Sequence, residues 1–299
     1  VKIEYKEYRI PKKSGGVRII KEPEKELKRY QTKVARGLYE AMDFAASHTN
    51  AFAYVKKRNC KMAIERHKRN KSRWIDLSDF FGSTNRTFVN DMLNIIHPFC
   101  ITRDIQRYLI PCYLDDTLPQ GAPSSPIITN IVMIPIDYEI TKLCSEKNLV
   151  YTRYSDDMII SGRDKFDYKH VVAEIQSVFI QFGSNYVINA KKTRFGSYAG
   201  RNFNLGLMYN KDGNITIGHR KKKIFKSQLV DLVTRPQTWT GIQKLNGIVN
   251  YYMSIEPDYI KYVIKHYSKK FNVDIMHMLR NGSSRNYDEE RMIREYWKK

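Results

Sequence analysis

The sequence predicts an α+β fold, in which antiparallel hairpins carry acidic residues and amphipathic helices pack against them. The clearest hairpin covers residues 149–162, where two apolar, β-favouring runs flank Asp156 and Asp157. A separate apolar run ends near Asp76, which we expect at the edge of a neighbouring strand. Helical periodicity at residues 168–182 predicts a helix that supports the sheet.

The overall composition favours a globular protein that binds a polyanion. The 299 residues carry a net charge of +21, so nucleic acid is the first candidate partner, and a merely soluble basic protein is the alternative. A hydrophobic fraction of 42% excludes a disordered chain. Four scattered cysteines without Cys-x-x-Cys spacing argue against a zinc ribbon or a disulfide framework and favour the cytoplasm. Residues 127–136, the most apolar stretch, are fewer than the ~20 that span a bilayer, so no membrane partner is expected.

The N-terminal segment predicts a second hairpin. Its strands are expected at residues 7–10 and 17–20, joined by a turn that contains paired glycines. Lys12, Lys13 and Arg18 lie on this hairpin and can contact an anion. A solvated basic turn is the alternative interpretation.

Helical patterns fill most of the chain between this hairpin and the next motif. Apolar residues repeat on one face of residues 23–39, and a basic helix is expected at residues 60–70. Within that helix, His67 is expected to be an exposed polar side chain rather than a specific contact. Residues 88–109 also predict a helix, and the acidic pair at residues 115–116 is expected in a solvated loop.

A polar residue and a glycine, Gln120 and Gly121, precede a helix that is expected at residues 127–146. Because glycine has no Cβ, Gly121 permits a close backbone approach to a ligand, and Gln120 can form a hydrogen bond there. Further along, residues 205–209 and 214–217 flank an Asp-Gly pair, which is a strong signal for a third hairpin.

From residue 218 onward the sequence becomes helical and rich in tyrosine and lysine. Three helical patterns are expected, ending near residues 233, 254 and 270. Tyrosines interleaved with lysines are typical of nucleic-acid surfaces, where rings stack on bases beside phosphate-binding cations. A helical core with a solvated basic face is the alternative, and one domain can contain both. The candidate nucleic-acid-binding residues are Arg220, Lys221, Lys222, Lys223, Tyr251 and Tyr252.

The three acidic residues on neighbouring strands form the candidate catalytic site. Adjacent aspartates at a turn are often only solvated, and the presence of Asp76 on a second strand argues instead for a site. Three carboxylates can hold two Mg²⁺ ions ~3.5–4 Å apart, which activates a 3′-hydroxyl and stabilises a pyrophosphate leaving group. Oxygen ligands and phosphate partners suit magnesium better than zinc.

Three motifs, in the same order along the chain, resemble those of the reverse transcriptases, and among them the bacterial retron type. Residues 154–157 match the Tyr-x-Asp-Asp box, residues 76–81 match the Asp-x-x-x-x-aromatic box, and residues 118–126 match the bacterial motif between them. The resemblance implies a right-hand polymerase with an antiparallel sheet in the palm. The implied domains are fingers at 1–72, with 83–118 contributing to fingers and palm, a palm at 73–217 and a helical thumb at 218–299.

The resemblance also implies an activity, RNA-directed DNA synthesis, and roles for individual residues. Asp76, Asp156 and Asp157 would be catalytic and, with Leu77, would hold two Mg²⁺ ions. Phe81 would exclude a 2′-hydroxyl and so select deoxynucleotides, because a packed site resists overfilling. Lys192, in a segment similar to the family's Asn-x-Lys-Lys-Thr element, would protonate the leaving pyrophosphate. The implied nucleotide-binding residues are Arg18, Lys12, Lys13, Phe81, Gln120, Gly121 and Lys192.

The implied partners are a structured non-coding RNA that serves as primer and template, its complementary DNA and deoxynucleotides. An effector or toxin protein is a further candidate partner, and antiphage defence is the implied role. Two alternatives stay open. One is another bacterial defence-associated reverse transcriptase that uses a different template or none, and the other is a catalytically idle RNA-binding scaffold.

Overall fold

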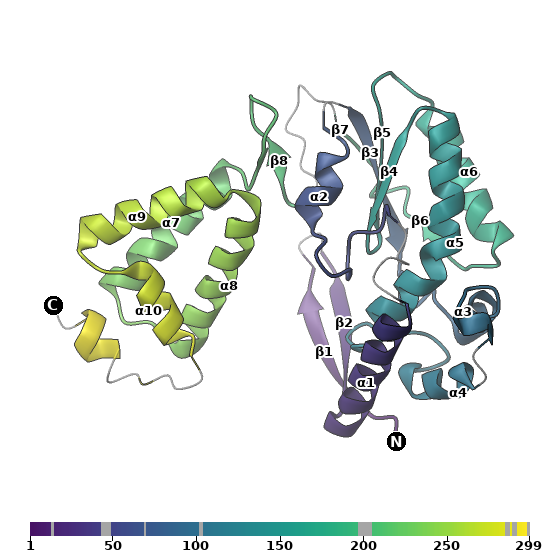
Figure 1. Ribbon diagram of the computed structural model, residues 1–299, viewed down its shortest axis with the longest axis horizontal. Coiled ribbons are helices and arrows are strands. Elements are labelled where there is room, and N and C mark those ends of the chain that lie inside the picture. The colour runs from purple at the N-terminus through teal and green to yellow at the C-terminus, as the bar shows by residue number, and fades with distance from the viewer. Residues whose placement is uncertain are drawn as a thin grey trace. The chain divides into compact units, whose positions relative to one another are not determined.

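A computed structural model describes the chain from residue 1 to residue 297 with several gaps (Figure 1). The described residues are 1–12, 15–42, 49–68, 70–101, 104–196, 205–284, 288 and 292–297. The chain divides into two compact units, residues 1–200 and residues 201–299. Within these ranges, none of the helices combines the length and the apolar composition of a membrane-spanning segment. No disulfide joins the four cysteines, all of which lie in the described ranges.

An antiparallel sheet of five strands forms the centre of the first unit. Strand β3 (Lys71–Ser78) pairs with β5 (Asp157–Gly162), and β5 pairs in turn with β4 (Val150–Tyr154). Two short strands, β6 (Val187–Ile188) and β7 (Arg194–Gly196), also pair with β3. The hairpin predicted at residues 149–162 and its neighbouring strand are therefore confirmed.

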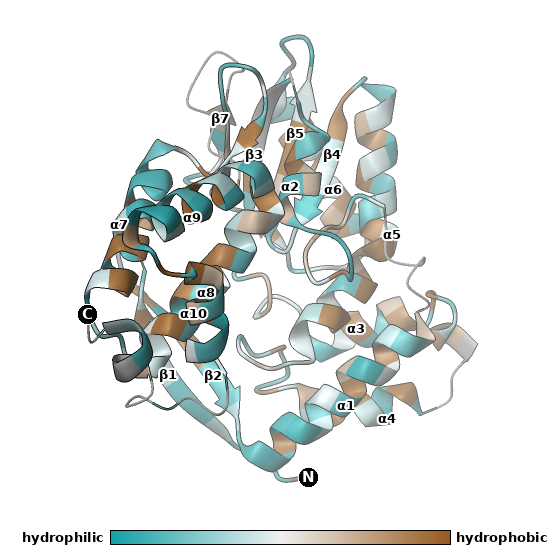
Figure 2. Cartoon of the chain, turned by 60° about the vertical axis from the view of Figure 1, so that its left-hand side comes forward, coloured by the Kyte–Doolittle hydropathy of each residue, from teal (hydrophilic) through white to brown (hydrophobic). Residues whose placement is uncertain are grey.

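Two long helices, α5 (Ser125–Glu146) and α6 (Tyr168–Gln181), lie beside the sheet on the same side (Figure 1). Because α5 buries residues on most of its faces, it has no clear polar side, as expected for a helix inside a core. Strand β5 is predominantly hydrophobic in Figure 2, which fits a strand buried beneath these helices. Both helices were expected within two residues of their observed bounds. The core includes Ile75, Val132, Ile136, Ile140, Met158, Ile160, Ile175 and Phe179.

The N-terminal hairpin consists of β1 (Tyr5–Pro11) and β2 (Val17–Pro23), as expected. Helix α1 (Lys25–Ala41) follows it and buries Leu27 and Leu38. The N–H of Lys21 in β2 donates to the main-chain oxygen of Gln120 at 2.8 Å. This bond joins the hairpin to the segment that precedes α5.

The structure corrects the expectation of a basic helix at residues 60–70. Helix α2 (Cys60–Glu65) is shorter, and the chain leaves it through turns. His67 is 1% exposed, so the expectation of an exposed side chain is wrong. Its two ring nitrogens lie 2.6 Å from Ser161 Oγ and 2.7 Å from Thr152 Oγ1, on adjacent strands. Burial lowers the pKa of His67 to about 3, so the ring is neutral and bonds as an uncharged group.

The expectation of a single helix at residues 88–109 is also wrong. The segment contains α3 (Arg86–Leu93), a 3₁₀ turn (Phe99–Ile101) and α4 (Ile105–Leu109), followed by a 3₁₀ turn at Ile110–Cys112. Pro98 lies between α3 and α4, where its missing N–H cannot support a helix. The acidic pair at 115–116 lies in a tight, exposed turn, as expected.

The second unit begins with a hairpin and continues as helices. The hairpin predicted around the Asp-Gly pair is present as β8 (Met208–Tyr209) and β9 (Ile215–Thr216). It falls in the compact unit that starts at residue 201, before the expected palm–thumb boundary at 217/218. The three predicted helices are α7 (His219–Thr234), α8 (Trp239–Ile255) and α9 (Pro257–Phe271). Two further helical segments, α10 (Ile275–Gly282) and Ile293–Trp297, were not predicted.

Candidate active site

Strands β3 and β5 bring two carboxylates together at one end of the sheet. In the antiparallel register Asp76 is paired with Asp157, and Asp156 lies in the adjoining turn. The N–H of Leu77 donates to the main-chain oxygen of Asp156 at 3.0 Å, which extends the ladder past the end of β5. Acidic residues that are distant in sequence therefore meet at one position, as the hairpin pattern predicted.

The turn between β4 and β5 contains only Ser155 and Asp156, because Tyr154 is paired directly with Asp157. Ser155 has a φ of 61°, in the left-handed region. Positive φ in a two-residue turn matches the twist of the flanking strands. The hairpin, rather than a flexible loop, therefore holds the two aspartates.

A cleft of about 840 Å³ opens over these carboxylates. Most of the residues that the sequence indicated as nucleotide-binding line it: Lys12, Arg18, Phe81, Gln120 and Lys192, together with Leu77 and the three aspartates. Lys13 lies outside the described residues. The cleft thus combines a carboxylate group on one side with cations of the β1–β2 hairpin on the other, which suits a ligand that carries phosphates.

Burial and mutual repulsion raise the pKa values of the two turn carboxylates. Burial, together with the charges of Asp156 and Asp76, raises the pKa of Asp157 to about 7. Burial also raises the pKa of Asp156, to which the Asp76 charge contributes. Lys192 opposes both shifts. Its Nζ lies 2.8 and 3.2 Å from the two oxygens of Asp76. A cation of higher charge at this position would relieve the remaining repulsion.

The donor atoms fit a hard divalent cation, although the side chains do not outline its coordination shell. In the described ranges, no three carboxylate, histidine or cysteine side chains converge closely enough to define a metal site by geometry. Asp76 is paired with Lys192 in this conformation. The Leu77 side chain is apolar and 2% exposed, so only its main-chain oxygen can serve as a ligand. Oxygen donors alone favour Mg²⁺ or Mn²⁺ over Zn²⁺.

The two adjacent phenylalanines after β3 have different surroundings. Phe80 is buried in the core and packs on Tyr186, with ring centroids 5.2 Å apart. Phe81 is partly exposed and lines the cleft, with its ring 5.6 Å from that of Phe80. The ring of Phe81 therefore packs against a buried core residue.

Gly121 makes its close approach to the protein itself. It has a φ of 122°, and a Cβ at this position would lie 2.7 Å from the main-chain oxygen of Lys21. Strand β2 therefore fills the space on the Cβ side of Gly121, and an approach of this glycine to a ligand stays a prediction. Gly121 supports the cleft by letting the segment before α5 lie against the β1–β2 hairpin.

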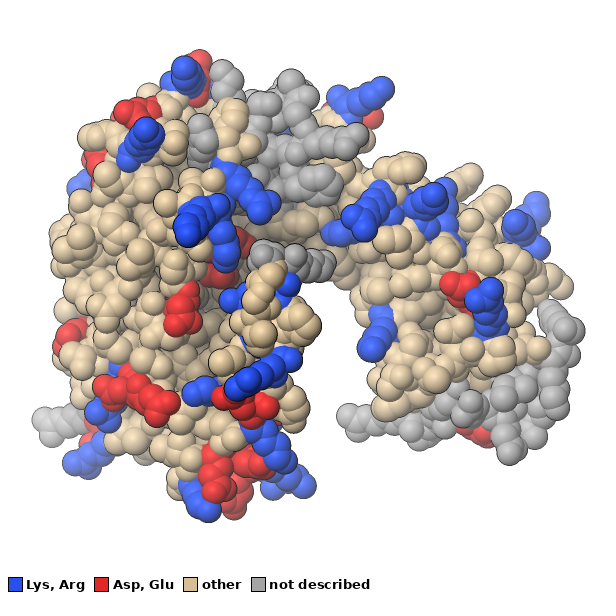
Figure 3. Space-filling view, turned by 180° about the vertical axis from the view of Figure 1, so that it is seen from behind, with Lys and Arg blue, Asp and Glu red and all other residues tan. Residues whose placement is uncertain are grey.

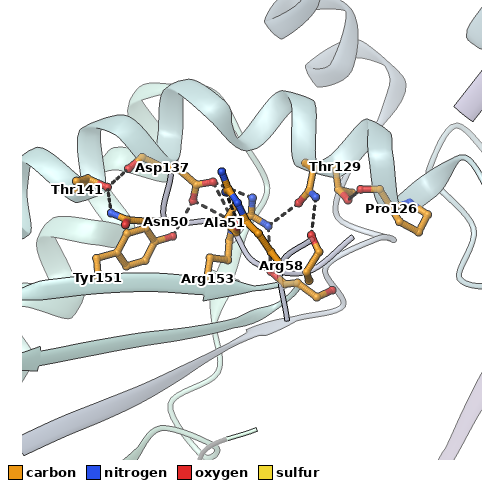
Figure 4. Close-up of polar contacts among 12 residues, drawn as sticks. Asn50, Ala51, Arg58, Pro126, Thr129, Asp137, Thr141, Tyr151 and Arg153 are labelled. Carbon is orange, nitrogen blue, oxygen red and sulfur yellow. Dashed lines mark hydrogen bonds and ion pairs between the residues drawn. The ribbon is translucent and has the colours of Figure 1, made fainter. Parts of the chain in front are cut away.

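Three residues at or beside this site were not predicted from the sequence. Tyr54 lines the cleft, and its hydroxyl lies 3.2 Å from Ser155 Oγ. Arg153 and Asp137 form an ion pair in which both side chains are 0% exposed (Figure 4). A signal for the pair exists, because each charge interrupts an otherwise apolar run, Asp137 in a helix and Arg153 in a strand. Buried charges need partners, so such interruptions indicate a pair.

The candidate nucleic-acid-binding residues of the second unit fall into two groups. Lys222 bonds to Glu256 at 2.6 Å and lies 4.0 Å from the ring centroid of Tyr259, so it stabilises the helical unit. Tyr252 packs edge-on against the buried Phe225 and is also structural.

The other candidates are more accessible. Tyr251 is 39% exposed, and Arg220 and Lys223 are exposed on α7. Lys221 donates to the main-chain oxygen of Gly206, which joins α7 to the preceding hairpin. On the face shown in Figure 3, the helical unit presents many Lys and Arg side chains and few Asp and Glu. Such a face is suited to a phosphate backbone.

An antiparallel sheet that carries paired carboxylates in a cation-lined cleft is the arrangement expected of a nucleotidyl-transferring polymerase. The chain belongs to the reverse transcriptase family, since residues 10–243 match the family described as "Reverse transcriptase (RNA-dependent DNA polymerase)". It is therefore an RNA-directed DNA polymerase. Its kinship is with the bacterial retron type, which confirms the resemblance found in the three motifs.

Among similar proteins, the retron Ec83 reverse transcriptase of Escherichia coli is 26% identical, over 89% of this chain and 87% of that protein. The retron Ec73 reverse transcriptase of the same organism is 29% identical, over 85% and 84%. A telomerase structure from Candida albicans, in complex with a telomeric RNA fragment, has a TM-score of 0.54 at 13% identity. It covers 92% of this chain, and the chain spans 55% of the telomerase chain. This likeness confirms the right-hand polymerase fold and no more.

Proposed function

We propose that Asp76, Asp156 and Asp157 bind two Mg²⁺ ions, with the main-chain oxygen of Leu77 as a further ligand. The observation that carries this proposal is the pairing of Asp76 with Asp157 beside Asp156, which concentrates negative charge at one end of the sheet. Reverse transcriptases use divalent metal ions. When bound, such ions activate a primer 3′-hydroxyl and stabilise the leaving pyrophosphate.

The same proposal assigns the rest of the cleft to a deoxynucleoside triphosphate. Arg18 and Lys12 lie on the β1–β2 hairpin and line the cleft, where they would bind the triphosphate, with Lys13 beside them in sequence. Gln120 would hydrogen-bond the nucleotide or template. Lys192 is half exposed and adjacent to Asp76, where it can give a proton to the departing pyrophosphate.

The pKa of Asp157 gives a first test of the metal site by thermal denaturation. The folded state raises the pKa of Asp157 to about 7, so ionising this carboxyl destabilises the fold. The protein therefore loses stability as the pH rises from the ordinary pKa of an aspartate to about 7. Without metal, Asp157→Asn should therefore raise Tm by about 3 °C or more near pH ~8. Mg²⁺ should raise the Tm of the unmodified protein near pH ~8, less near pH ~6, and little in the variant. Asp91→Asn, at an exposed carboxylate on α3, is the control. An equal Mg²⁺ response in Asp157→Asn and the unmodified protein would contradict the assignment.

Phe81 gives a second test, in the choice of sugar. Phe81→Ala should let ribonucleotides enter, lowering the preference for deoxynucleotides by about 10- to 100-fold, since overfilling a packed site costs ~1–3 kcal/mol. The measurement is kcat/KM for a matched ribonucleotide and deoxynucleotide. Phe179→Leu is the matched control, because Phe179 is a fully buried ring on α6 that packs on Tyr186 and does not line the cleft, so the change should lower Tm without changing the preference. If Phe81→Ala leaves the ratio of kcat/KM for deoxynucleotide and ribonucleotide unchanged, Phe81 does not select the sugar.

We further propose that the template is a structured non-coding RNA copied into DNA in the cytoplasm, in antiphage defence, with an effector or toxin protein as partner. Kinship with retron reverse transcriptases and the basic, tyrosine-bearing helical unit support this proposal. We propose fingers at 1–72, with 83–118 contributing to fingers and palm, a palm at 73–217 and a thumb at 218–299.

The alternative of template-independent synthesis makes a different prediction. Nucleotide addition should be compared for one primer annealed to RNA, annealed to DNA of the same sequence, or single-stranded. Addition directed by the RNA sequence supports the proposal. Untemplated addition of equal rate with the single-stranded primer would favour another defence-associated polymerase, and no addition in any form would favour an idle scaffold.

A further inference from the structure

A buried ionic network contacts the turn between β4 and β5 through the main-chain oxygen of Ser155, and Figure 4 shows its central ion pair. Asp137 on α5 and Arg153 on β4 form its centre, and neither side chain is exposed. Arg153 Nη2 donates to one Asp137 oxygen at 2.7 Å and Nε donates to the other at 2.9 Å. The Tyr151 hydroxyl donates to the same carboxylate at 2.8 Å. One edge of the guanidinium is therefore fixed on α5 by a bidentate contact.

The remaining nitrogen of Arg153 is directed at the turn. Nη1 donates to Asn130 Oδ1 at 3.1 Å and to the main-chain oxygen of Ser155 at 3.3 Å. Asn130 donates in turn to the main-chain oxygen of Ala53 at 2.8 Å. The guanidinium thus connects a helix of the core to the residue immediately before Asp156.

The turn needs such support because of its backbone conformation. Ser155 has a φ of 61°, and a left-handed conformation costs a residue with a Cβ about 1–2 kcal/mol. Strain of this kind persists only where surrounding contacts fix it. The hydrogen bond from Arg153 to the Ser155 oxygen is one such contact, and the Tyr54 hydroxyl near Ser155 Oγ is another.

The guanidinium of Arg153 stays protonated although it is buried. Burial disfavours the guanidinium, but the Asp137 carboxylate outweighs burial, so the pKa of Arg153 is raised. A buried ion pair is seldom more stabilising than well-packed apolar side chains of the same volume. Stability alone therefore does not explain why this pair is present.

We propose that Arg153 is a positioning residue for catalysis: anchored on Asp137, it holds the Ser155 carbonyl so that Asp156 and Asp157 are directed toward Asp76. The inference rests on the proposed function, since it takes these three carboxylates to be the metal-binding groups. It adds the group that fixes their geometry. The competing explanation is that the pair only stabilises the packing of α5 against β4.

Arg153→Lys separates these explanations. A lysine can keep the ion pair with Asp137 but cannot also reach Asn130 and the Ser155 oxygen, because it lacks the planar fork. Single-turnover nucleotide addition should slow by about tenfold or more, because even a small misplacement of reacting groups lowers the rate strongly. The Mg²⁺ concentration for half-maximal rate should rise severalfold, while RNA affinity stays unchanged.

Tyr151→Phe is the matched control. It removes a hydrogen bond to the same buried carboxylate but touches no atom of the turn. It should lower Tm without changing the Mg²⁺ dependence. If Arg153→Lys also changes only Tm, the positioning role is refuted. A rise in the half-maximal Mg²⁺ concentration with Arg153→Lys and not with Tyr151→Phe supports it.

A second variant keeps the test decisive if Arg153→Lys does not fold. Arg153→Met combined with Asp137→Leu replaces the pair with apolar side chains and should fold. Nucleotide addition by this double variant should remain slower than that of the unmodified protein and should require a higher Mg²⁺ concentration. A rate like that of the unmodified protein would overturn the proposal. Failure of the underlying function is distinguishable, since Asp156→Asn would then retain activity whatever the Arg153 variants do.

Discussion

Asp156→Asn is expected to abolish nucleotide addition, with a fall in single-turnover rate of about 10³-fold or more. This loss corresponds to about 4 kcal/mol of transition-state stabilisation, the scale expected when a metal-binding charge is removed. Asparagine keeps the size of the side chain and removes its charge. The turn should survive, because its hydrogen bond from Leu77 uses the main-chain oxygen of Asp156.

The controls for this variant separate chemistry from folding. RNA affinity should match that of the unmodified protein, and Tm should not fall, because burial and the neighbouring Asp76 make the ionised Asp156 carboxylate destabilising in the metal-free fold. Asp91→Asn, at a solvent-exposed position, should leave the rate unchanged. If Asp156→Asn retains a rate within a fewfold of the unmodified protein, the carboxylate assignment is wrong.

Asp137→Leu is expected to cause the largest loss of stability. It leaves the fully buried Arg153 guanidinium and the Tyr151 hydroxyl without their acceptor. Removing one partner of a buried ion pair costs about 3–5 kcal/mol, which corresponds to a fall in Tm of about 10 °C in a chain of this size. Equilibrium unfolding in urea measures the change in the free energy of unfolding.

The double variant Asp137→Leu with Arg153→Met tests the cause of that loss. Removing both charges takes away the unpaired group, so most of the lost stability should return. The coupling between the two sites should therefore be on the order of 2 kcal/mol or more in a double-mutant cycle. Additive losses would show that the two side chains do not act as a pair.

Much of the fold and site was predictable because the signals are local. Alternating or continuous apolar runs around a two-residue turn predicted the β4–β5 hairpin, and the Asp-Gly pair predicted β8–β9. The sequence placed Asp76 at the edge of a strand next to this hairpin, and the register that sets it opposite Asp157 comes from the structure. The cations of the β1–β2 hairpin were likewise visible as exposed charges.

The features that sequence reasoning missed depend on tertiary packing. His67 follows the short helix α2, and only the two strands that meet its ring nitrogens reveal why it is buried. The approach of Gly121 to Lys21 joins segments that are distant in sequence. The partnership of Asp137 with Arg153 requires α5 to lie against β4, which no local periodicity specifies.

The most direct test of the central claim is to sequence the nucleic acid that co-purifies with the protein from its native host, with and without Asp156→Asn. The account predicts one abundant structured RNA joined to a short complementary DNA, with the DNA lost in the variant and the RNA retained. Heterogeneous or untemplated DNA would contradict copying of a cognate RNA. The same DNA in both samples would contradict the role of Asp156 itself.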